Sequence, residues 1–519
     1  MTMSSAPLSR LAPGHIDLWR CALIVALAAA LGALLAHFLS LASSSVVMIR
    51  FPFGADYGEG IVWQQMRNIV HGTGYARLGV FPAIVYHYPP VYHVTVAGVA
   101  RLFGADELAT GRAISWLCTL GAASLCGWLA VKTASLRDRS QAVIVIALTA
   151  LVFTSCEPVI EWAAMMRVDM LAGLLSLAGI ALTLTGVRQP RLLAFAAVSF
   201  VLAFYTKQTS VAAPAAAFVG LFSVQPRRAL MMGALGVALG AAVLLLLSWI
   251  TDGGFLRHIL FYNINRFEPK AIWSLLTPLR DHAIYLVLAG GGGVLLIRRV
   301  LAHWPDRKEQ PLSVASAITT LCYFALKALM LVMIMKSGAS SNYLIELCSA
   351  VAILVGVAVA PAIGLLLQLF HRRTGASNQA LLSCVILSAI ALQACLLPRV
   401  ILKMENARIA SDELRPIVQL IRGSAKPVIS DDMVALIRAG REVQWEAAIT
   451  AELGAQGVYD QAAFAAMIRQ HRFGMFITEG EPGDTTFDSR YNPEVVQAIL
   501  QAYPITRQVG RFTVHSPAI

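Results

Sequence analysis

Charged residues are scarce in this chain of 519 residues, since Asp, Glu, Lys and Arg make up 13% of it and hydrophobic residues make up 57%. Soluble domains carry about 25% charged residues, so the composition excludes an ordinary soluble protein. Apolar runs of membrane-spanning length recur between residues 18 and 397. The sequence therefore predicts an α-helical polytopic membrane protein with about eleven transmembrane helices.

Cysteine is also sparse, with eight residues and none after Cys395. No spacing of Cys and His typical of a zinc site or a disulfide framework is present. No glycine-rich loop of a nucleotide-binding type occurs, because the four glycines at 290–293 lie inside an apolar run and are expected to serve helix packing or a kink. The first apolar run lacks the cleavage site of a signal peptide. The residues by themselves therefore indicate neither a cofactor nor a metal.

The net charge of +12 does not indicate a nucleic-acid partner, because the basic residues do not gather in one patch. They lie instead in short loops between apolar runs, as at Arg137 and Arg139, Arg188 and Arg191, Arg227 and Arg228, Arg298 and Arg299, and Arg372 and Arg373. This is the pattern of loops on the cytoplasmic side. Arg10 and Arg20 precede the first apolar run, which predicts a cytoplasmic N-terminus in a multi-pass protein of the plasma (inner) membrane.

Two domains are predicted. Residues 1–398 form the transmembrane domain, with a long first outer loop at 43–108, and residues 399–519 form a small α/β domain, extracytoplasmic by parity. Val91–Phe103 is apolar but too short to span, so it is expected to lie at the outer membrane interface. Within the second domain, periodicity predicts helices at Asn406–Ile421, Asp432–Arg438, Asp460–His471 and Pro493–Ala502, and strands at Pro427–Ser430, Met475–Thr478, Ile505–Val509 and Arg511–His515.

The first outer loop holds two carboxylates, Asp56 and Glu59, in the turn GADYGEG. A sugar hydroxyl has a very high pKa, so a carboxylate must take its proton as a bond forms; the two acids are candidates for a general base and a helper acid. The alternative is that they cap the helix that follows. Both roles fit together if Glu59 caps the helix while Asp56 points into a cavity. In the same loop, His87 and Tyr88 of YHYPP are candidates for binding substrate.

Further candidates lie where apolar runs end. Arg167 and Asp169, in MMRVDM, form either a wall of the same outer cavity or an ordinary interfacial ion pair. Lys207, in YTKQTS, follows a short run and is costly unless it is paired or hydrated, so it is a candidate for holding a lipid phosphate. Gln208 would add an amide contact, and Arg266 in the third outer loop could serve an anion.

The segment SNYLIE contributes Asn342, Tyr343 and Glu346, and its spacing places Asn342 and Glu346 on one helix face. These three residues are candidates for binding substrate. Lys327 lies near the middle of an apolar run and needs a partner that the sequence does not reveal, whereas Lys336 near the end of that run has the position of an interface anchor.

The order of these motifs resembles the GT-C superfamily of polytopic glycosyltransferases that use polyprenyl-phosphate sugars, which includes the aminoarabinose transferase of lipid A and the protein mannosyltransferases. The resemblance covers the membrane part and rests on the acidic first loop, YHYPP, RVDM, YTKQTS and SNYLIE. It implies an inverting transfer without a nucleotide sugar, with Asp56 as the base. Many members have adjacent acids, whereas Tyr57 and Gly58 separate the two here. Some members use a divalent metal.

The resemblance implies three kinds of partner: the lipid bilayer, a polyprenyl-phosphate sugar, and a glycan, lipid or protein acceptor. Lys207, with Arg167 or Arg266, would offset the charge of the leaving phosphate, and Tyr86, Tyr88 and Trp63 would stack on sugar faces. A lipid-linked sugar flippase or transporter is the alternative, although no inverted repeat is visible and the polar residues lie in the outer loops rather than at the midplane. A structural partner of a polymerase, without chemistry, is a third class.

Overall fold

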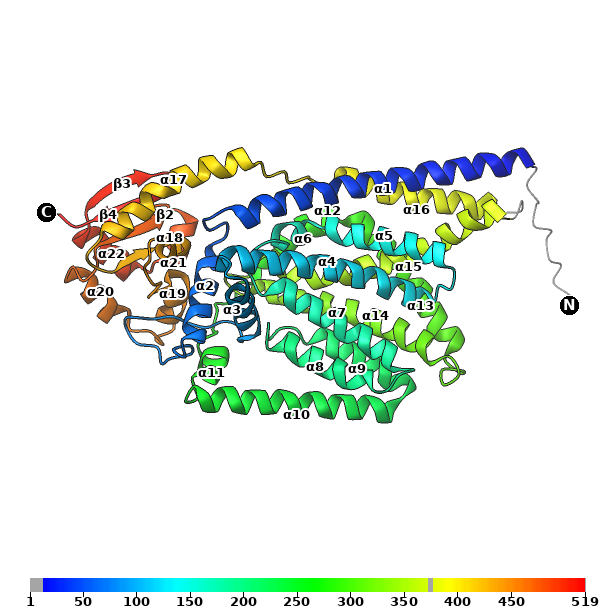
Figure 1. Ribbon diagram of the computed structural model, residues 1–519, viewed down its shortest axis with the longest axis horizontal. Helices are drawn as coiled ribbons and strands as arrows, with labels where there is room; N and C mark the ends of the chain where they lie inside the picture. The colour runs from blue at the N-terminus through cyan, green and yellow to red at the C-terminus, as the bar shows by residue number, and fades with distance from the viewer. Residues whose placement is uncertain (1–12, 372–376, 519) are drawn as a thin grey trace.

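The helical bundle and the C-terminal domain lie end to end along the long axis of the molecule (Figure 1). The computed structural model describes residues 13–371 and 377–518. Arg10, Arg372 and Arg373, which contribute to the predicted orientation, lie outside these residues. The bundle helices run along the long axis, and the start of α1 lies at the end far from the C-terminal domain.

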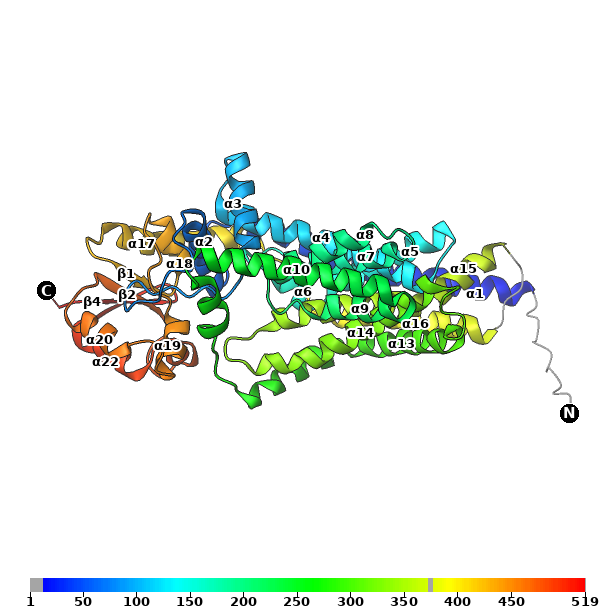
Figure 2. The ribbon, with the colours of Figure 1, turned by 90° about the horizontal axis from the view of Figure 1, so that it is seen from below.

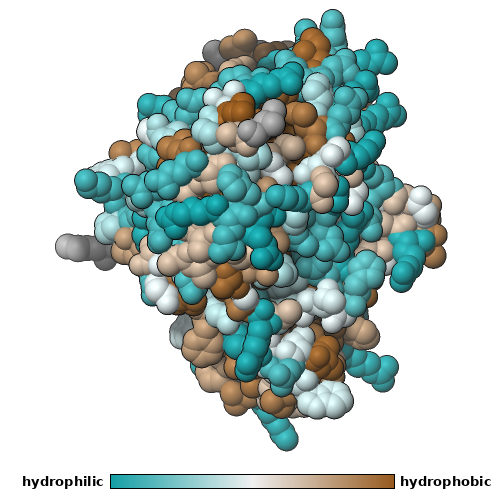
Figure 3. Space-filling view, turned by 90° about the vertical axis from the view of Figure 1, so that its left-hand side faces the viewer, coloured by the Kyte–Doolittle hydropathy of each residue, from teal (hydrophilic) through white to brown (hydrophobic). Residues whose placement is uncertain are grey.

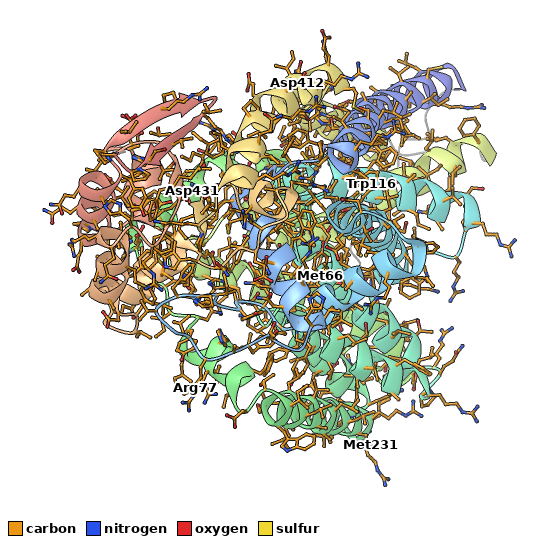
Figure 4. The ribbon with its side chains drawn as sticks, turned by 60° about the vertical axis from the view of Figure 1, so that its left-hand side comes forward. Met66, Arg77, Trp116, Met231, Asp412 and Asp431 are labelled. Atoms are coloured by element: carbon orange, nitrogen blue, oxygen red, sulfur yellow. The ribbon has the colours of Figure 1, made fainter. Side chains whose placement is uncertain are left out.

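Among the described residues, eight helices are long and apolar enough to cross a membrane. They are α1 (Pro13–Arg50), α4 (Glu107–Ala134), α7 (Asp169–Gly186), α10 (Pro226–Ile250), α13 (Ala283–His303), α14 (Pro311–Leu329), α15 (Ile345–His371) and α16 (Ser377–Leu396). Their outward faces are apolar. On α10, for example, Leu245 and Trp249 are exposed, as is Met231, which Figure 4 labels on the outer side of the helix. Such an apolar girdle suits lipid and not water, and the chain is a multi-pass membrane protein.

Three shorter apolar helices complete the bundle: α5 (Arg139–Ser155), α8 (Leu192–Phe204) and α9 (Ala212–Val224). They lie beside long helices, α5 against α4, α8 against α7 and α9 against α14 (Figure 1). Together with the eight long helices, they coincide with the eleven apolar runs from which membrane spans were predicted.

Close approach of helices depends on small residues in this bundle. At Gly292 of α13, a Cβ atom would lie 2.1 Å from the carbonyl oxygen of Leu354 on α15. The packing role predicted for the glycines at 290–293 is thus confirmed at Gly292, and α13 continues through them without a break.

The apolar segment that is too short to span is helix α3, and its bounds, Val91–Phe103, agree with the prediction. Figure 2 shows α3 running across the bundle axis and projecting from the side of the bundle, which is the direction of a helix lying in the membrane interface. Leu102 and Phe103 at its end are strongly exposed. The remaining short helices around the bundle are α2 (Tyr57–Val70), α6 (Glu157–Trp162), α11 (Gly254–Leu256), η1 (Arg257–Phe261), η2 (Pro269–Leu275), α12 (Leu276–Asp281), η3 (Met330–Met335) and η4 (Ser341–Leu344).

The C-terminal domain is a four-stranded sheet with helices around it. The strands β1 (Val428–Ser430), β2 (Met475–Glu479), β3 (Ile505–Val509) and β4 (Phe512–Ser516) have the order β1-β2-β4-β3. Strand β1 pairs with β2 in parallel, whereas β4 is antiparallel to both of its neighbours. The helices are α17 (Met404–Gly423), α18 (Met433–Arg438), α19 (Ala447–Ala455), α20 (Gln461–Arg469), α21 (Thr485–Arg490) and α22 (Pro493–Ala502). The four predicted helices and four predicted strands are confirmed within a few residues, but α19 and α21 were not predicted. Figure 3 views this end of the molecule, where hydrophilic residues cover much of the surface.

The first outer loop and the C-terminal domain pack together although they are far apart in the chain. The backbone N–H of Ala83 donates to the carbonyl of Gln444 (2.7 Å), and the hydroxyl of Tyr459 donates to the carbonyl of Val80 (2.7 Å). Ala83 and Val85 belong to the same hydrophobic core as the stacked rings of the C-terminal domain. The first outer loop is therefore packed into the C-terminal domain and shares its hydrophobic core.

Candidate functional site

A cavity of about 400 Å³ lies where the bundle end, the first outer loop and the C-terminal domain meet. Its walls come from the start of α2, the segment before α3, the loops that follow α6 and α8, the loop at 263–265, the loop at 336–340, and α19. The loop at 336–340 lies between η3 and η4. Of the twelve candidate residues predicted from the sequence, seven line this cavity: Asp56, His87, Tyr88, Arg167, Lys207, Gln208 and Tyr343.

Asp56 begins helix α2 and faces the cavity. One of its carboxylate oxygens, Oδ2, accepts hydrogen bonds from the backbone N–H of Gly58 (2.9 Å) and from Nη1 of Arg167 (2.8 Å). A Cβ atom at Gly58 would lie 1.4 Å from the same Arg167 nitrogen, so glycine is required there for the arginine to reach Asp56. The other oxygen, Oδ1, makes no hydrogen bond to the described residues.

Glu59 lies outside the cavity and is completely buried. Arg112 donates to both of its oxygens (2.8 and 2.5 Å), and the backbone N–H groups of Met166 and Ala55 donate to one oxygen each (2.8 and 2.9 Å). Burial opposes ionisation, but Arg112 and these hydrogen bonds outweigh it and hold the pKa of Glu59 below its ordinary value. Asp56 therefore lines the cavity, as expected, and also caps α2, whereas Glu59 accepts from the backbone just ahead of α2 and in addition forms a buried ion pair with Arg112.

Lys207 reaches the cavity wall and has an internal partner. Its Nζ lies 2.6 Å from Oδ1 of Asp169 and 4.9 Å from the centre of the Tyr343 ring. The amide nitrogen of Asn342 donates to the same Asp169 oxygen (2.9 Å). Asp169 and Asn342 do not line the cavity themselves. Asp169 pairs with Lys207, and Asn342 in turn donates to Asp169.

Glu346 lies deeper in the bundle, where it supplies the partner that Lys327 was predicted to need (2.5 Å). Asn342 and Glu346, expected to act on one helix face, thus serve two different lysines. Arg266 lies at the cavity rim, half-exposed, and pairs with Glu452 (3.1 Å). Five of the twelve candidates therefore do not line the cavity: Glu59, Asp169, Arg266, Asn342 and Glu346.

The aromatic residues expected to stack on a sugar are only partly at the cavity. Tyr88 lines it and its hydroxyl accepts a long contact from Arg167 (3.4 Å). Trp63 and Tyr86 are instead fully buried and are not among the lining residues. Trp162, which the sequence interpretation missed, lines the cavity and lies under the Arg167 guanidinium (5.0 Å).

Beside Tyr88, His87 is partly buried at the cavity wall. Burial lowers its pKa to about 4, and the positive charges of Arg167 and Lys336 add to the effect. His87 is therefore neutral near pH 7 and can exchange hydrogen bonds with a ligand, but it does not offer a positive charge.

Unpartnered polar atoms gather around this cavity. Within the part of the chain that the structure describes, Nε of Arg167, Oδ2 of Asp169, Oε1 of Gln208, Oδ1 of Asn342 and Oε2 of Glu446 are buried and lack a hydrogen-bond partner. Buried polar groups are rarely left unpaired in proteins. Five of them on or next to one cavity indicate that the cavity receives a polar ligand or ordered water.

The sequence interpretation missed the wall formed by the C-terminal domain. Glu446, Ile449 and Glu452 line the cavity from α19 and the residue before it. Lys336, predicted to be an interface anchor, also lines it. One local signal was present, since Glu446 stands alone among apolar neighbours in QWEAAI.

A metal site is not evident in the described residues, where no three His, Cys, Asp or Glu side chains come together as ligands. The side chains that line the cavity include the Asp56 carboxylate with one unbonded oxygen, the Glu446 carboxyl group, cationic groups on Arg167, Lys207 and Lys336, and aromatic faces.

The fold is shared with two solved structures, in agreement with the GT-C-like architecture that the resemblance implied. The crystal structure of ArnT from Cupriavidus metallidurans bound to undecaprenyl phosphate is similar over 98% of this chain and 98% of that one, with a TM-score of 0.53 and 15% identity. The archaeal oligosaccharyltransferase AglB from Archaeoglobus fulgidus, in complex with an inhibitory peptide and a dolichol-phosphate, is similar over 93% of this chain and 74% of that one (TM-score 0.54, 10% identity). By sequence, neither a protein-family model nor a curated protein matches the chain. At these identities the likeness concerns the fold.

Proposed function

We propose that this protein is a membrane glycosyltransferase that moves a sugar from a polyprenyl-phosphate donor to an envelope acceptor at the outer face of the plasma membrane. The observation that carries the proposal is the cavity at the bundle end, where Asp56 keeps one free carboxylate oxygen beside a cluster of cationic and unpartnered polar groups. The shared fold supports it, because the ArnT structure holds undecaprenyl phosphate and the AglB structure holds dolichol-phosphate.

The proposed reaction is a single displacement with inversion. The acceptor hydroxyl oxygen attacks the anomeric carbon from the face opposite the phosphate, and the bond between that carbon and the phosphate oxygen breaks with its electron pair going to the phosphate. The hydroxyl proton passes to Oδ1 of Asp56. Arg167 and the backbone N–H of Gly58 fix Oδ2, which leaves Oδ1 unbonded on a residue that lines the cavity.

The leaving phosphate needs positive charge near it. Lys207 and Arg167 are the proposed phosphate ligands because both line the cavity and each is held by an internal acid, Asp169 and Asp56 respectively. Lys336 is a further candidate from the same wall. Gln208 and Tyr343 would contact the sugar or phosphate alongside Lys207, whereas Arg266 would act from the rim.

The proposed orientation places the N-terminus in the cytoplasm and the C-terminal domain outside. Helix α7 illustrates the support for it: α7 begins at Asp169 beneath the cavity and ends at Gly186, and the basic residues Arg188 and Arg191 follow at the far end. Basic loops favour the cytoplasmic side, so the cavity opens on the outer side. Reporter fusions after Pro398 that are active only in the cytoplasm would contradict this orientation.

The test of the function is transfer by the purified protein in sealed vesicles containing labelled polyprenyl-phosphate sugar and envelope lipids and glycans. A glycosyltransferase yields a new labelled covalent product together with free polyprenyl phosphate. A flippase, the alternative class, moves the label between leaflets without a product. Movement of label without any product, from protein shown to be folded, would overturn the proposal.

A further inference from the structure

Glu446 is a buried carboxyl group that the fold itself does not use. It directly precedes α19, is 6% exposed and lines the cavity from the side of the C-terminal domain. A residue at this position normally accepts a hydrogen bond from the first helical turn, but the Glu446 side chain makes none. Its Oε2 is buried without a partner among the described residues. Local structure therefore does not explain a glutamate here.

The neighbours of Glu446 are already engaged with other groups. Arg167 donates to Asp56 (2.8 Å), and Glu452, the other acid on this wall, pairs with Arg266 and accepts from Ser337 (2.7 Å). Arg167 after α6 and Tyr57 at the start of α2 lie near Glu446, with Asp431 and Arg490 on the other side of Tyr57. The other charged or titratable residues that line the same cavity are Asp56, His87, Tyr88, Glu161, Lys207, Lys336, Tyr343 and Glu452. None of them forms an ion pair with Glu446.

The charge state of Glu446 follows from this isolation. Burial raises its pKa to about 8, and the positive charge of Arg167 only partly offsets the effect. Near pH 7 the group is therefore mostly a neutral carboxylic acid, which offers one O–H donor in addition to its acceptor oxygens. Asp56, which lines the same cavity, keeps its arginine partner.

We propose that Glu446 binds the acceptor by donating a hydrogen bond from its neutral carboxyl group to an uncharged hydroxyl oxygen of a saccharide. The inference rests on the proposed transferase function and names the acceptor as hydroxyl-rich, that is, a glycan or a molecule that carries one. A neutral acid suits an uncharged oxygen, whereas an anionic group would be drawn to Arg167 and Lys207. Because Glu446 and Asp56 line one cavity, this contact would bring the acceptor to the base.

The probe for this site is octyl glucoside, used below its micellar concentration with the full-length protein in lipid nanodiscs. Its affinity should fall about tenfold between pH 6 and pH 9, because a group with a pKa near 8 loses about nine-tenths of its neutral form over that range. Glu446→Gln keeps a donor, so its affinity should stay close to the wild-type value at pH 6 and should not change with pH. Glu446→Ala should bind about tenfold more weakly at pH 6. Glu494→Gln, an exposed acid on α22, is the matched control and should follow the wild type.

Two results would overturn the assignment: wild-type affinity that does not vary with pH, or Glu446→Ala with unchanged affinity. Absence of sugar transfer by the wild type would overturn the proposed function instead. The two failures are distinguishable because glucoside binding is measured without turnover.

Discussion

Two carboxylates three residues apart in one turn have opposite environments in this protein. Glu59 is fully buried, and both of its oxygens are saturated by Arg112 and backbone N–H groups. The Asp56 side chain is 28% exposed and lines the cavity, its Oδ2 is held by Arg167, and its Oδ1 makes no hydrogen bond to the described residues.

The difference shows how an acid–arginine pair can serve either stability or chemistry. A carboxylate whose lone pairs are all used cannot accept a proton without breaking those bonds, and a buried charge that loses its partner is costly. A carboxylate held at one oxygen stays oriented and ionised while the other oxygen remains available. Glu59 thus fixes the turn that aims Asp56.

The largest expected effect comes from Asp56→Asn. The amide keeps the size of the side chain but cannot accept the proton, so single-turnover transfer should slow by about two to four orders of magnitude. The thermal midpoint in detergent should change little, because Asn is also a good residue for capping a helix. Near wild-type turnover in folded Asp56→Asn would remove Asp56 as the base.

Glu59→Gln should have the reverse profile. It leaves Arg112 buried with its partner gone, which typically costs about 3–5 kcal/mol of folding free energy, while turnover per folded molecule should stay close to wild type. The pKa of Glu59 is lower in the folded protein than in the unfolded chain, so its stabilisation is present above the unfolded pKa and disappears as pH falls through the folded value.

The control for this variant is therefore the pH dependence of melting. The gap in thermal stability between wild type and Glu59→Gln should be widest near neutral pH and should narrow in acid. A gap that does not narrow, or a loss of turnover as large as that of Asp56→Asn, would contradict the structural role.

The same contrast extends to two lysines that are both paired within the protein. Lys207 pairs with Asp169 at the cavity, and Lys327 pairs with Glu346 inside the bundle. Lys207→Met and Lys327→Met should both lower stability, because each leaves an acid without its cation. Only Lys207→Met should also raise the KM for the lipid-linked donor, by about tenfold or more for a lost phosphate contact. Equal donor KM values in the two variants would remove Lys207 from the phosphate site.

The sequence could predict the bundle and most of the C-terminal domain because hydropathy and periodicity are local properties. The apolar segments Leu192–Phe204 and Val91–Phe103 are confirmed as helices with the predicted bounds for that reason. The pairs that define the site join distant positions, 53 residues apart for Glu59 and Arg112 and 38 apart for Lys207 and Asp169. No local pattern reveals such pairs, and this is why the sequence did not predict that Glu59 is buried against Arg112.

The contribution of the C-terminal domain to the cavity was hidden for a similar reason. Helix α19 is short and nearly apolar on all sides, so it lacks the amphipathic period that marks a helix in a sequence. Glu446 and Glu452 lie at the cavity where the first outer loop contacts the C-terminal domain. Ala83 of that loop pairs with Gln444 and Trp445, the residues just before Glu446.

The smallest effect should come from Gly58→Ala, which tests the contact between Asp56 and Arg167 without removing either residue. A Cβ atom at Gly58 would overlap Nη1 of Arg167, so the guanidinium must move away and Oδ2 of Asp56 loses its partner. Transfer should slow by about tenfold, the scale of one charge-assisted hydrogen bond. Stability should fall modestly, because the largely buried Arg167 loses its carboxylate partner and Gly58, as the second residue of α2, gains little from the helix propensity of alanine. Gly54→Ala is the matched control, since its Cβ would meet the nearest atom at 3.3 Å and leaves Arg167 in place. If both alanine variants turn over at the wild-type rate, the Arg167 contact is not needed to orient Asp56. If both slow equally, the cause is the turn itself and not the arginine.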